Sequence, residues 1–467
     1  MNKWWQIGKY MVADWGTAAL AWFLFNLFRY HHLVVFREVS TLGEFLCYPH
    51  VLLGQIGIPF FWWVVYYFSG YYNFPVSRSR LNELWLTLIS SFVGVIILFF
   101  VLIINETPFA YQLYYQFLVV LFGTHFGLTY LVRLSITTHF LNALKHGKVF
   151  QRVVLFGIGA RALSIAGQLQ AVGYRVVGFV PVSDAEEQAV PDELLWRERS
   201  LVSERIQQQA VDELVVVTEA LDSIALSQFL YTLYIYKKPI KVWMDKQSVP
   251  FSKIRLQAVN GVPFATITEN NFSPAEQNLK LFADRIVSAA MLLLLCPLYL
   301  YIAWRVKRDS PGPIIYKQER IGLHGRPFLI YKFRTMYVGS EEQGPMLSRE
   351  DDKRITPFGS IMRKYRLDEL PQFWNVLKGD MSLVGPRPER KYFIDQIVQK
   401  APYYYLLHNV RPGITSLGMV KYGYAGTVDQ MIARLEYDIV YYENMSLALD
   451  IAILVYTVKT VLTGKGV

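Results

Sequence analysis

The chain has 467 residues, of which 53% are hydrophobic and only 18% are charged, and its formal net charge is +10. A soluble protein carries about 25% charged residues, so this composition excludes an ordinary soluble enzyme and indicates a membrane protein of about three domains. The two cysteines, Cys47 and Cys296, give neither a disulfide framework nor a CxxC zinc site. The positive charge favours an anionic partner: nucleic acid, lipid headgroups or a phosphorylated substrate.

Residues 1–145 are predicted to form a four-helix transmembrane domain. Four nearly uncharged segments approach the ~20 residues that cross ~30 Å of hydrocarbon. They are Tyr10–Phe28, Pro49–Gly70, Leu84–Asn105 and Tyr111–Val132. We expect the first to be a retained anchor, because no small-residue cleavage site follows it. Asp14, near its start, is interpreted as a carboxylate at the membrane interface, with a functional acid as the alternative.

The basic residues around these segments predict their orientation. They precede the first span, separate the second from the third, and follow the fourth, so the positive-inside rule places the N-terminus and everything beyond residue 145 in the cytoplasm. These residues are Lys3, Lys9, Arg78, Arg80, Arg133, Lys145, Lys148 and Arg152. Arg29 and Arg37, assigned to the first loop, oppose this majority.

Residues 146–265 are predicted to form a Rossmann-like α/β domain. An apolar run enters Gly157-Ile158-Gly159 and is followed by a helix-like stretch and a second strand, the opening of a doubly wound unit. A further strand is expected over Leu214–Val217. Ala162 takes the third glycine position, and the second strand ends without an acid to hold a ribose. A structural or oligomerisation module is therefore favoured over dinucleotide binding.

The apolar run Ile286–Ala303 is long enough to be a fifth spanning helix, but we expect it to be re-entrant. Pro297, near its middle, removes a backbone donor and kinks the helix. Basic residues flank both ends, and a helix that enters and leaves by one face puts both flanks at the same headgroup layer. The flanking residues are Lys280, Arg285, Arg305, Lys307 and Arg308.

The segment Trp304–Thr335 is strongly basic, with eight Lys or Arg residues against Asp309 and Glu319. Beside a membrane hairpin, lipid phosphate or nucleotide phosphate is a better target than nucleic acid. The alternative is that basic side chains only contact lipid headgroups, and it would explain the basic residues at the start of the segment. Lys332 and Arg334 alternate with aromatic residues as in a strand, so both are expected to project from one face.

A helix is predicted to begin near Asp368, with Asp368 or the residue before it at the cap. Pro371 is tolerated only in a first turn, apolar residues including Trp374 then share one face, and Gly379 ends the helix. The free N–H groups of a helix start would keep Asp368 ionised and could hold phosphate. An ionised carboxylate can attack phosphorus, whereas the alternative is that Asp368 and Glu369 only cap the helix.

Nearby arginines support the catalytic interpretation. Arg363, Arg366 and Arg387 could share the negative charge of a diphosphate, and Mg²⁺ held by a carboxylate and the substrate phosphates would screen the rest. Pro386 and Pro388 restrict the backbone around Arg387, so its guanidinium is presented with little entropy to lose.

Six motifs then support a family resemblance over residues 278–465. They are Ser310-Pro-Gly-Pro313, Gln318-Glu-Arg320-Ile-Gly322, Lys332-Phe-Arg-Thr-Met336, Leu367-Asp-Glu-Leu-Pro371, Gly379-Asp-Met-Ser-Leu-Val-Gly-Pro-Arg-Pro388 and Arg411-Pro-Gly-Ile-Thr415. In this order they resemble the bacterial sugar transferases known as monotopic phosphoglycosyl transferases. The whole plan resembles the larger exopolysaccharide biosynthesis polyprenyl glycosylphosphotransferases.

The resemblance implies that residues 275–467 form an α/β catalytic domain with a re-entrant membrane helix, on the cytoplasmic side of the bacterial inner membrane. It implies transfer of a sugar 1-phosphate from a nucleotide diphosphate sugar, usually a UDP-sugar, to undecaprenyl phosphate. This reaction is the first membrane step of exopolysaccharide, capsule or O-antigen synthesis. Asp368 is then the nucleophile that forms a phosphosugar–aspartate intermediate, and Glu369 helps to organise Mg²⁺.

The resemblance also implies substrate-binding residues and partners. The phosphate-binding candidates are Lys332, Arg334, Arg363, Arg387, Gln318 and Arg320. The partners are the nucleotide sugar, undecaprenyl phosphate and membrane lipid, with no nucleic acid and with a homo-oligomer possible. Cys296, where some relatives have serine, and Ser-Leu-Gly-Met-Val after Thr415 depart from the pattern. The competing hypotheses are a membrane-anchored NAD(P)-dependent sugar-nucleotide enzyme and a non-catalytic membrane scaffold.

Overall fold

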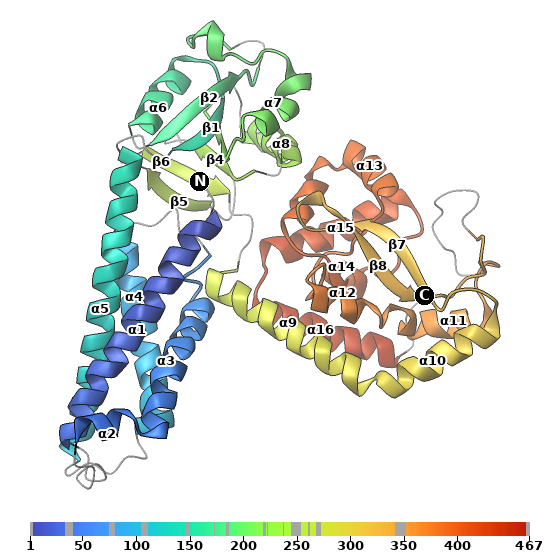
Figure 1. Cartoon of the computed structure of the whole chain (residues 1–467). Coiled ribbons are helices and arrows are strands. Elements are labelled where there is room, and N and C mark those ends of the chain that lie inside the picture. The colour runs from blue at the N-terminus through green and yellow to red at the C-terminus, as the bar shows by residue number, and fades with distance from the viewer. Residues whose placement is uncertain are drawn as a thin grey trace. The chain divides into compact units, whose positions relative to one another are not determined.

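The computed structural model consists of helices and strands (Figure 1). The residues that it describes are 3–32, 41–73, 80–103, 111–145, 150–171, 173–183, 186–217, 221, 223–236, 238–243, 254–259, 262–267, 272–340 and 352–463. Arg78 and Lys148, which support the predicted orientation, and Arg37, which opposes it, lie outside these residues.

Four long helices form the N-terminal part, as predicted: α1 (Lys3–His32), α3 (Pro49–Phe68), α4 (Arg80–Leu98) and α5 (Gln112–Lys145). Each contains a window that is long and apolar enough to cross a membrane. A short helix, α2 (Leu42–Leu46), precedes α3, and α4 continues as a π-helical stretch over Phe99–Ile103. With 34 residues, α5 is about 51 Å long and exceeds the ~30 Å of hydrocarbon.

The four helices enclose buried charges. Asp14 of α1 and Arg133 of α5 are only 1% and 0% exposed. Nε and Nη2 of Arg133 donate to the two carboxylate oxygens of Asp14 at 2.7 and 2.8 Å. The guanidinium of Arg133 also lies over the rings of Tyr66 and Tyr71, 3.9 and 3.5 Å from their centroids. Tyr71 in turn donates to Glu83, a second buried acid.

This ion pair corrects two sequence predictions. Asp14, expected as a carboxylate at the membrane interface, is buried against a cation that lies 119 residues away in the sequence, so it is not exposed to solvent. Arg133 is not a loop residue after the fourth helix, and Arg29 lies within α1 rather than in the first loop. Neither arginine therefore counts as a loop charge under the positive-inside rule.

The middle of the chain forms a six-stranded sheet in the order β2-β1-β3-β4-β6-β5. The first four strands are parallel, and β6 and β5 add an antiparallel hairpin. The strands are β1 (Gln151–Phe156), β2 (Tyr174–Val180), β3 (Glu213–Val216), β4 (Ile240–Trp243), β5 (Ile254–Val259) and β6 (Val262–Ile267).

Helices cover both faces of this sheet (Figure 1). α6 (Ala160–Gln170) packs on one face through a cluster that includes Val153 and Leu155 of β1. On the other face, α7 (Val202–Gln208) and α8 (Ser223–Leu233) pack against alternate residues of the same strand. The α/β alternation expected for this part of the chain is therefore observed.

Two apolar helices follow, with a sharp bend between them. α9 (Pro274–Leu294) and α10 (Cys296–Asp309) meet at 63°, and Pro297 lies in the first turn of α10. Proline is favoured there because its missing N–H is not needed in a first helical turn. Leu293 and Leu294 are among the most exposed apolar side chains of the bend.

The side chain of Lys280 in α9, which was expected to contact a headgroup layer, is instead enclosed by the C-terminal domain. Its side chain is only 11% exposed and its Nζ lies 2.6 Å from Oδ2 of Asp450. The same Nζ donates to the backbone carbonyl of Val384 at 3.1 Å. Tyr441 donates to the other oxygen of Asp450 at 2.7 Å. Lys280 therefore joins α9 to the interior of the C-terminal domain.

The C-terminal domain is an α/β unit with two small sheets. β7 (Ile315–Ile321) and β8 (Pro327–Phe333) form an antiparallel hairpin, and β9 (Ser382–Val384) pairs in parallel with β10 (Gly413–Thr415). Its helices are α11 (Pro357–Lys364), α12 (Gln372–Lys378), α13 (Lys391–Lys400), α14 (Leu417–Lys421), α15 (Val428–Glu443) and α16 (Leu447–Leu462). A core of buried residues from α13, α15 and a 3₁₀ segment (Pro402–Asn409) supports the strand ends.

Candidate active site

Asp368 and Glu369 lie in a tight turn of the C-terminal domain. After α11, Arg366 takes a left-handed backbone conformation with φ of 54°, and a single 3₁₀ turn, Leu367–Glu369, follows. Both acidic residues in this turn are only 7% exposed. Carboxylates with so little access to water need cations or hydrogen-bond donors close by.

Cations from three segments surround the two acids. Nζ of Lys332, near the end of β8, lies 2.7 Å from Oε1 of Glu369 and 3.8 Å from Oδ2 of Asp368. Nη2 of Arg387 is 3.3 Å from the same Glu369 oxygen. Nη1 of Arg366 is 4.0 Å from Oε2 of Glu369. Three cations thus lie within ion-pair distance of two carboxylates. The resulting surplus of positive charge can attract a phosphate.

The two carboxylates differ in pKa because their surroundings differ. Burial raises the pKa of Asp368 above its ordinary value, and the charge on Glu369 raises it further. The cations Lys332 and Arg363 lower this pKa but do not cancel the rise. Burial also acts on Glu369, but Lys332 and two arginines outweigh it, so the pKa of Glu369 is lowered. Glu369 therefore holds its negative charge more firmly. Asp368 is the more basic carboxylate and, when deprotonated, the better nucleophile.

The helix after the acids begins later than predicted. α12 starts at Gln372 rather than near Asp368, so its dipole does not explain the ionisation of the acids, and the surrounding cations take that role. The predicted apolar face is observed only in part: Phe373 and Leu377 are partly buried, but Trp374 is 50% exposed whereas Asn375 is completely buried. The Asn375 side chain accepts from one backbone N–H of β8 and donates to one of its carbonyls, at 3.1 and 2.7 Å. Asn375 thereby holds α12 against the strand that carries Lys332.

Arg387 also has partners other than the acids. Asp438 of α15 is buried and accepts hydrogen bonds from the backbone N–H of Gly418 at 2.9 Å and of Arg387 at 3.5 Å. The sulfur of Met419 lies 2.9 Å from Nη1 of Arg387. The chain around Pro386 and Arg387 therefore has fixed partners in α14 and α15.

Gln318 and Arg320 support the same loop instead of lining the acids. Arg320 donates to the carbonyl of Pro388 at 3.2 Å and lies 3.4 Å from the carboxylate of Glu389. Gln318 accepts from Arg320 at 2.7 Å. Arg434 of α15 forms a second buried ion pair with Glu389. Sequence reasoning missed Glu389, Arg434 and Asp438; only Glu389 had a local signal, as the residue that follows the Pro-Arg-Pro motif.

Arg334 does not join the cluster around the acids. It donates to the carbonyls of Ser310 and Pro311 at 2.6 and 2.7 Å, just after the end of α10. Gly312 is needed beside it, since a Cβ there would lie 2.0 Å from Nη1 of Arg334. β8 ends at Phe333, so the strand alternation that predicted a shared face with Lys332 stops before Arg334. Its geometry is that of a structural residue.

The glycine turn of the middle domain is covered by the chain itself. Gly157 has a φ of +132°, and a Cβ there would lie 1.8 Å from the carbonyl oxygen of Val217. Ala189 donates its N–H to the carbonyl of Ile158 at 2.8 Å. A carboxylate oxygen of Glu186 lies 3.6 Å from the position of such a Cβ at Gly157. An acid at this turn repels a pyrophosphate, which disfavours the dinucleotide-dependent hypothesis.

The acids supply part of the ligand set that a magnesium ion needs. No group of three or more His, Cys, Asp or Glu side chains is arranged to hold a metal in the part of the chain that the structure describes. Mg²⁺ keeps several waters and is commonly bound by one or two carboxylates together with substrate phosphates. Asp368 and Glu369, adjacent in one turn, fit that minimal pattern.

An α/β domain with two buried acids among cations, on a chain with four apolar helices, is typical of a membrane-associated enzyme that acts on phosphates. The profile of the family described as bacterial sugar transferase matches residues 275–464. The chain belongs to the bacterial sugar transferase family.

Individual relatives agree with this assignment. The chain is 32% identical over 347 residues to a UDP-glucose:undecaprenyl-phosphate glucose-1-phosphate transferase of Xanthomonas campestris pv. campestris, covering 70% of each chain. It is 30% identical over 360 residues to the undecaprenyl-phosphate galactose phosphotransferase of Salmonella typhimurium, covering 71% of this chain and 72% of that one.

A third relative matches only the C-terminal part. It is the UDP-N-acetylgalactosamine-undecaprenyl-phosphate N-acetylgalactosaminephosphotransferase of Aeromonas hydrophila, which is 44% identical over 194 residues. This match covers 42% of this chain and 46% of the relative, so the chain spans about half the length of this relative. The three relatives differ in the sugar that they transfer.

Proposed function

We propose that this protein transfers a sugar 1-phosphate from a UDP-sugar to undecaprenyl phosphate, as the first membrane step in the synthesis of an exopolysaccharide, capsule or O-antigen. The observation that carries the proposal is the buried pair Asp368 and Glu369 with Lys332 and Arg387 in ion-pair distance of it. The printed activities of the relatives supply the two substrates.

In the first step of the proposed reaction, Asp368 attacks the phosphorus that carries the sugar. A bond forms between a carboxylate oxygen and this phosphorus, and the bond from phosphorus to the bridging oxygen of the diphosphate breaks. The nucleoside monophosphate leaves with that electron pair, and the sugar phosphate stays on Asp368. Lys332, Arg363 and Arg387 stabilise the charge that accumulates on the phosphate oxygens.

In the second step, an oxygen of undecaprenyl phosphate attacks the same phosphorus. The aspartyl–phosphorus bond breaks and the Asp368 carboxylate is restored, so the product is a sugar joined to the lipid through a diphosphate. Glu369 keeps its negative charge throughout because its pKa is lowered, and it holds Lys332 and Arg387 in place. Mg²⁺, held by Asp368, Glu369 and the diphosphate, would offset charge on the departing nucleotide.

The bent pair α9 and α10 is proposed to enter and leave the cytoplasmic face of the bacterial inner membrane. The support is the 63° bend at Pro297 and the exposed apolar side chains beside it, which include Leu293, Leu294 and Leu300. Lys307 and Arg308, both exposed near the end of α10, would contact headgroup phosphates. The donor is water-soluble and the acceptor is a lipid, so a site at this surface gives both of them access.

The middle domain is proposed to be a Rossmann-like structural module that takes no part in the transfer. The support is the parallel order of its first four strands and the acid beside its glycine turn.

Trapping of the intermediate tests the proposed reaction. The full-length protein, in detergent with Mg²⁺ and a radiolabelled UDP-sugar but without lipid, should acquire label on the peptide that contains Asp368 and release UMP. Asp368→Asn should do neither, while Asp395→Asn, at an exposed acid of α13, should behave as the parent. Lipid-dependent transfer that survives Asp368→Asn would overturn the mechanism. A panel of UDP-sugars identifies the donor through UMP release.

A further inference from the structure

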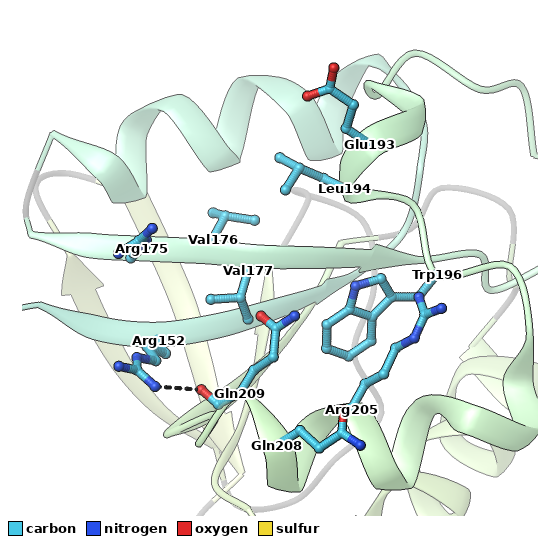
Figure 2. Close-up of a pocket in the computed structure, with 10 residues that line it drawn as sticks. All are labelled: Arg152, Arg175, Val176, Val177, Glu193, Leu194, Trp196, Arg205, Gln208 and Gln209. Atoms are coloured by element: carbon cyan, nitrogen blue, oxygen red, sulfur yellow. Dashed lines mark hydrogen bonds between the residues drawn. The ribbon is translucent and has the colours of Figure 1, made fainter.

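The middle domain holds a cavity of about 560 Å³, but the basic side chains that line it already have partners (Figure 2). Nη1 of Arg152 donates to the backbone carbonyl of Gln209 at 2.8 Å. The guanidinium of Arg205 lies beside the indole of Trp196, 5.8 Å from the ring centroid. The cations of this cavity therefore point to separate partners, whereas those of the C-terminal domain converge on the two acids.

The turn that carries Asp368 and Glu369 packs on α10, the second of the two apolar helices at the bend. Leu367 and Leu370, which flank the acids, are partly buried against an apolar cluster that α10 forms with β8 and α11. The buried members of this cluster are Ile302, Val306, Phe333, Phe358 and Met362. The position of the acids therefore depends on a helix that is itself proposed to enter the membrane.

α10 presents opposite faces to the cluster and to the surroundings. The residues that pack into the cluster have the spacing of one helix face. They are Tyr299, Ile302, Ala303 and Val306. On the opposite face, Leu300, Tyr301 and Trp304 are each more than half exposed. A shift of α10 would thus be passed through its packed face to the residues beside Asp368.

Tyr299 adds a directional contact to this packing. Its hydroxyl donates a hydrogen bond to the backbone carbonyl of Leu370 at 2.7 Å. Its ring lies 5.8 Å from the ring of Phe333, the residue that follows Lys332 in β8. Tyrosines at a membrane surface commonly direct the hydroxyl to headgroups or water, but this hydroxyl is bound by the protein. One side chain of α10 therefore contacts both the segment of the acids and the strand of their nearest cation.

The carbonyl of Leu370 also has a second partner. The N–H of Phe373, in the first turn of α12, donates to it at 3.1 Å. Loss of the Tyr299 hydroxyl would therefore not leave this carbonyl without a hydrogen bond, which is the usual cause of a large loss of stability. It would remove the hydrogen bond between α10 and the junction of the acids with α12. The hydroxyl is thus suited to positioning and contributes little to folding.

We propose that Tyr299 is a positioning residue for the nucleophile Asp368. It holds the turn in the orientation that α10 sets, so that the carboxylate approaches the phosphorus in line with the leaving group. Misplacing a reacting group by about 1 Å can cost about a hundredfold in rate, so one well-placed hydrogen bond is enough to matter. This inference rests on the proposed function, because the role that it gives to Tyr299 is in the attack by Asp368.

The variant Tyr299→Phe of the full-length protein tests this role, because it removes the hydroxyl and keeps the ring against Phe333. Single-turnover labelling of Asp368 by the radiolabelled UDP-sugar, in detergent with Mg²⁺ and without lipid, should slow by about three- to tenfold, the effect of one neutral hydrogen bond. The UDP-sugar concentration that gives half the maximal rate should not change, and neither should the acidic limb of the pH profile, because no charge is removed. Tyr301→Phe, on the exposed face of α10, is the matched control and should label as the parent does.

Hydrogen exchange gives a second readout that does not depend on the reaction. The amides at the start of α12, including that of Phe373, should exchange faster in Tyr299→Phe than in the parent and in Tyr301→Phe. If the parent acquired no label, the proposed function would fail, and the exchange at Phe373 would still decide whether Tyr299 holds the turn.

Three results would overturn the inference. They are an unchanged labelling rate in Tyr299→Phe, unchanged exchange at Phe373, and a weaker affinity for the UDP-sugar that accounts for the whole loss of rate. Faster exchange throughout the C-terminal domain would also count against positioning, because it would indicate a general loss of stability. Equal melting temperatures of Tyr299→Phe and the parent are therefore expected.

Discussion

Replacing Lys332 with methionine should reveal how Asp368 is kept ionised. Lys332 is a cation near both acids, and its Nζ lies 3.8 Å from Oδ2 of Asp368. At an effective dielectric constant of about 20, two unit charges at this distance attract each other by about 4 kcal/mol. Water and the neighbouring arginines will replace part of this attraction. A loss of roughly 2–3 kcal/mol corresponds to activity that is lower by up to about a hundredfold at pH values where Asp368 is ionised in the parent but protonated in the variant.

The sign of the pH effect follows from the chemistry. Burial already raises the pKa of Asp368, and Lys332 lowers it, so the methionine variant should have a still higher pKa at this residue. Only the carboxylate attacks phosphorus, and it is populated above its pKa. The acidic limb of the rate profile should therefore move to higher pH, and part of the lost activity should return as the pH is raised.

The assay is UMP release from the UDP-sugar with Mg²⁺ and undecaprenyl phosphate in detergent, from about pH 5 to about pH 9. Lys332→Arg keeps the charge and should leave the acidic limb in place, which makes it the matched control. If Lys332→Met lost activity by the same factor at every pH, Lys332 would act only on the substrate, and the reasoning about Asp368 would be refuted.

Three further predictions concern stability. Arg133→Leu leaves Asp14 buried without its cation and should lower the free energy of unfolding of the helical domain by about 3–5 kcal/mol. The loss should appear as a lower melting temperature in detergent, and Asp14→Asn in the same chain should recover much of it; no recovery would contradict the ion-pair account. Glu389→Gln removes the acid between two arginines and should reduce melting temperature and UMP release together, and unchanged activity would show that this ion pair does not hold the Pro-Arg-Pro loop. Gly178→Ala places a Cβ 2.2 Å from the indole of Trp196 and should cost about 1–3 kcal/mol in chemical denaturation, whereas a neutral effect would mean that the indole has room to move.

The features that could be predicted from the sequence are those determined by residues in one continuous segment. Four uncharged runs identified the four long helices, because length and hydropathy alone decide whether a helix can span a membrane. Asp368 and Glu369 were located together with Arg387 because a short segment carries all three. The hairpin that brings Lys332 to them could be anticipated only as a basic strand.

The features that escaped prediction depend on contacts between distant parts of the chain. No residue near Asp14 in the sequence indicates that it pairs with a cation 119 residues away, so the partner of Asp14 could not be inferred. Asn375 is buried instead of Trp374 because an amide can satisfy the open backbone groups of a strand, which a spacing rule for apolar residues does not take into account. Arg334 does not share a face with Lys332, because β8 ends one residue before Arg334.

The ion pair between Lys280 and Asp450 has a consequence for any attempt to obtain a water-soluble form of the catalytic domain. Lys280 is part of α9, yet it also holds the carbonyl of Val384, the last residue of β9 before the loop that carries Arg387. A shortened chain that begins after α9 would leave Asp450 inside the domain without its cation and would release the end of β9. α9 is thus also an internal part of the C-terminal domain, and solubilisation should come from mutating the exposed leucines at its far end, not from deletion.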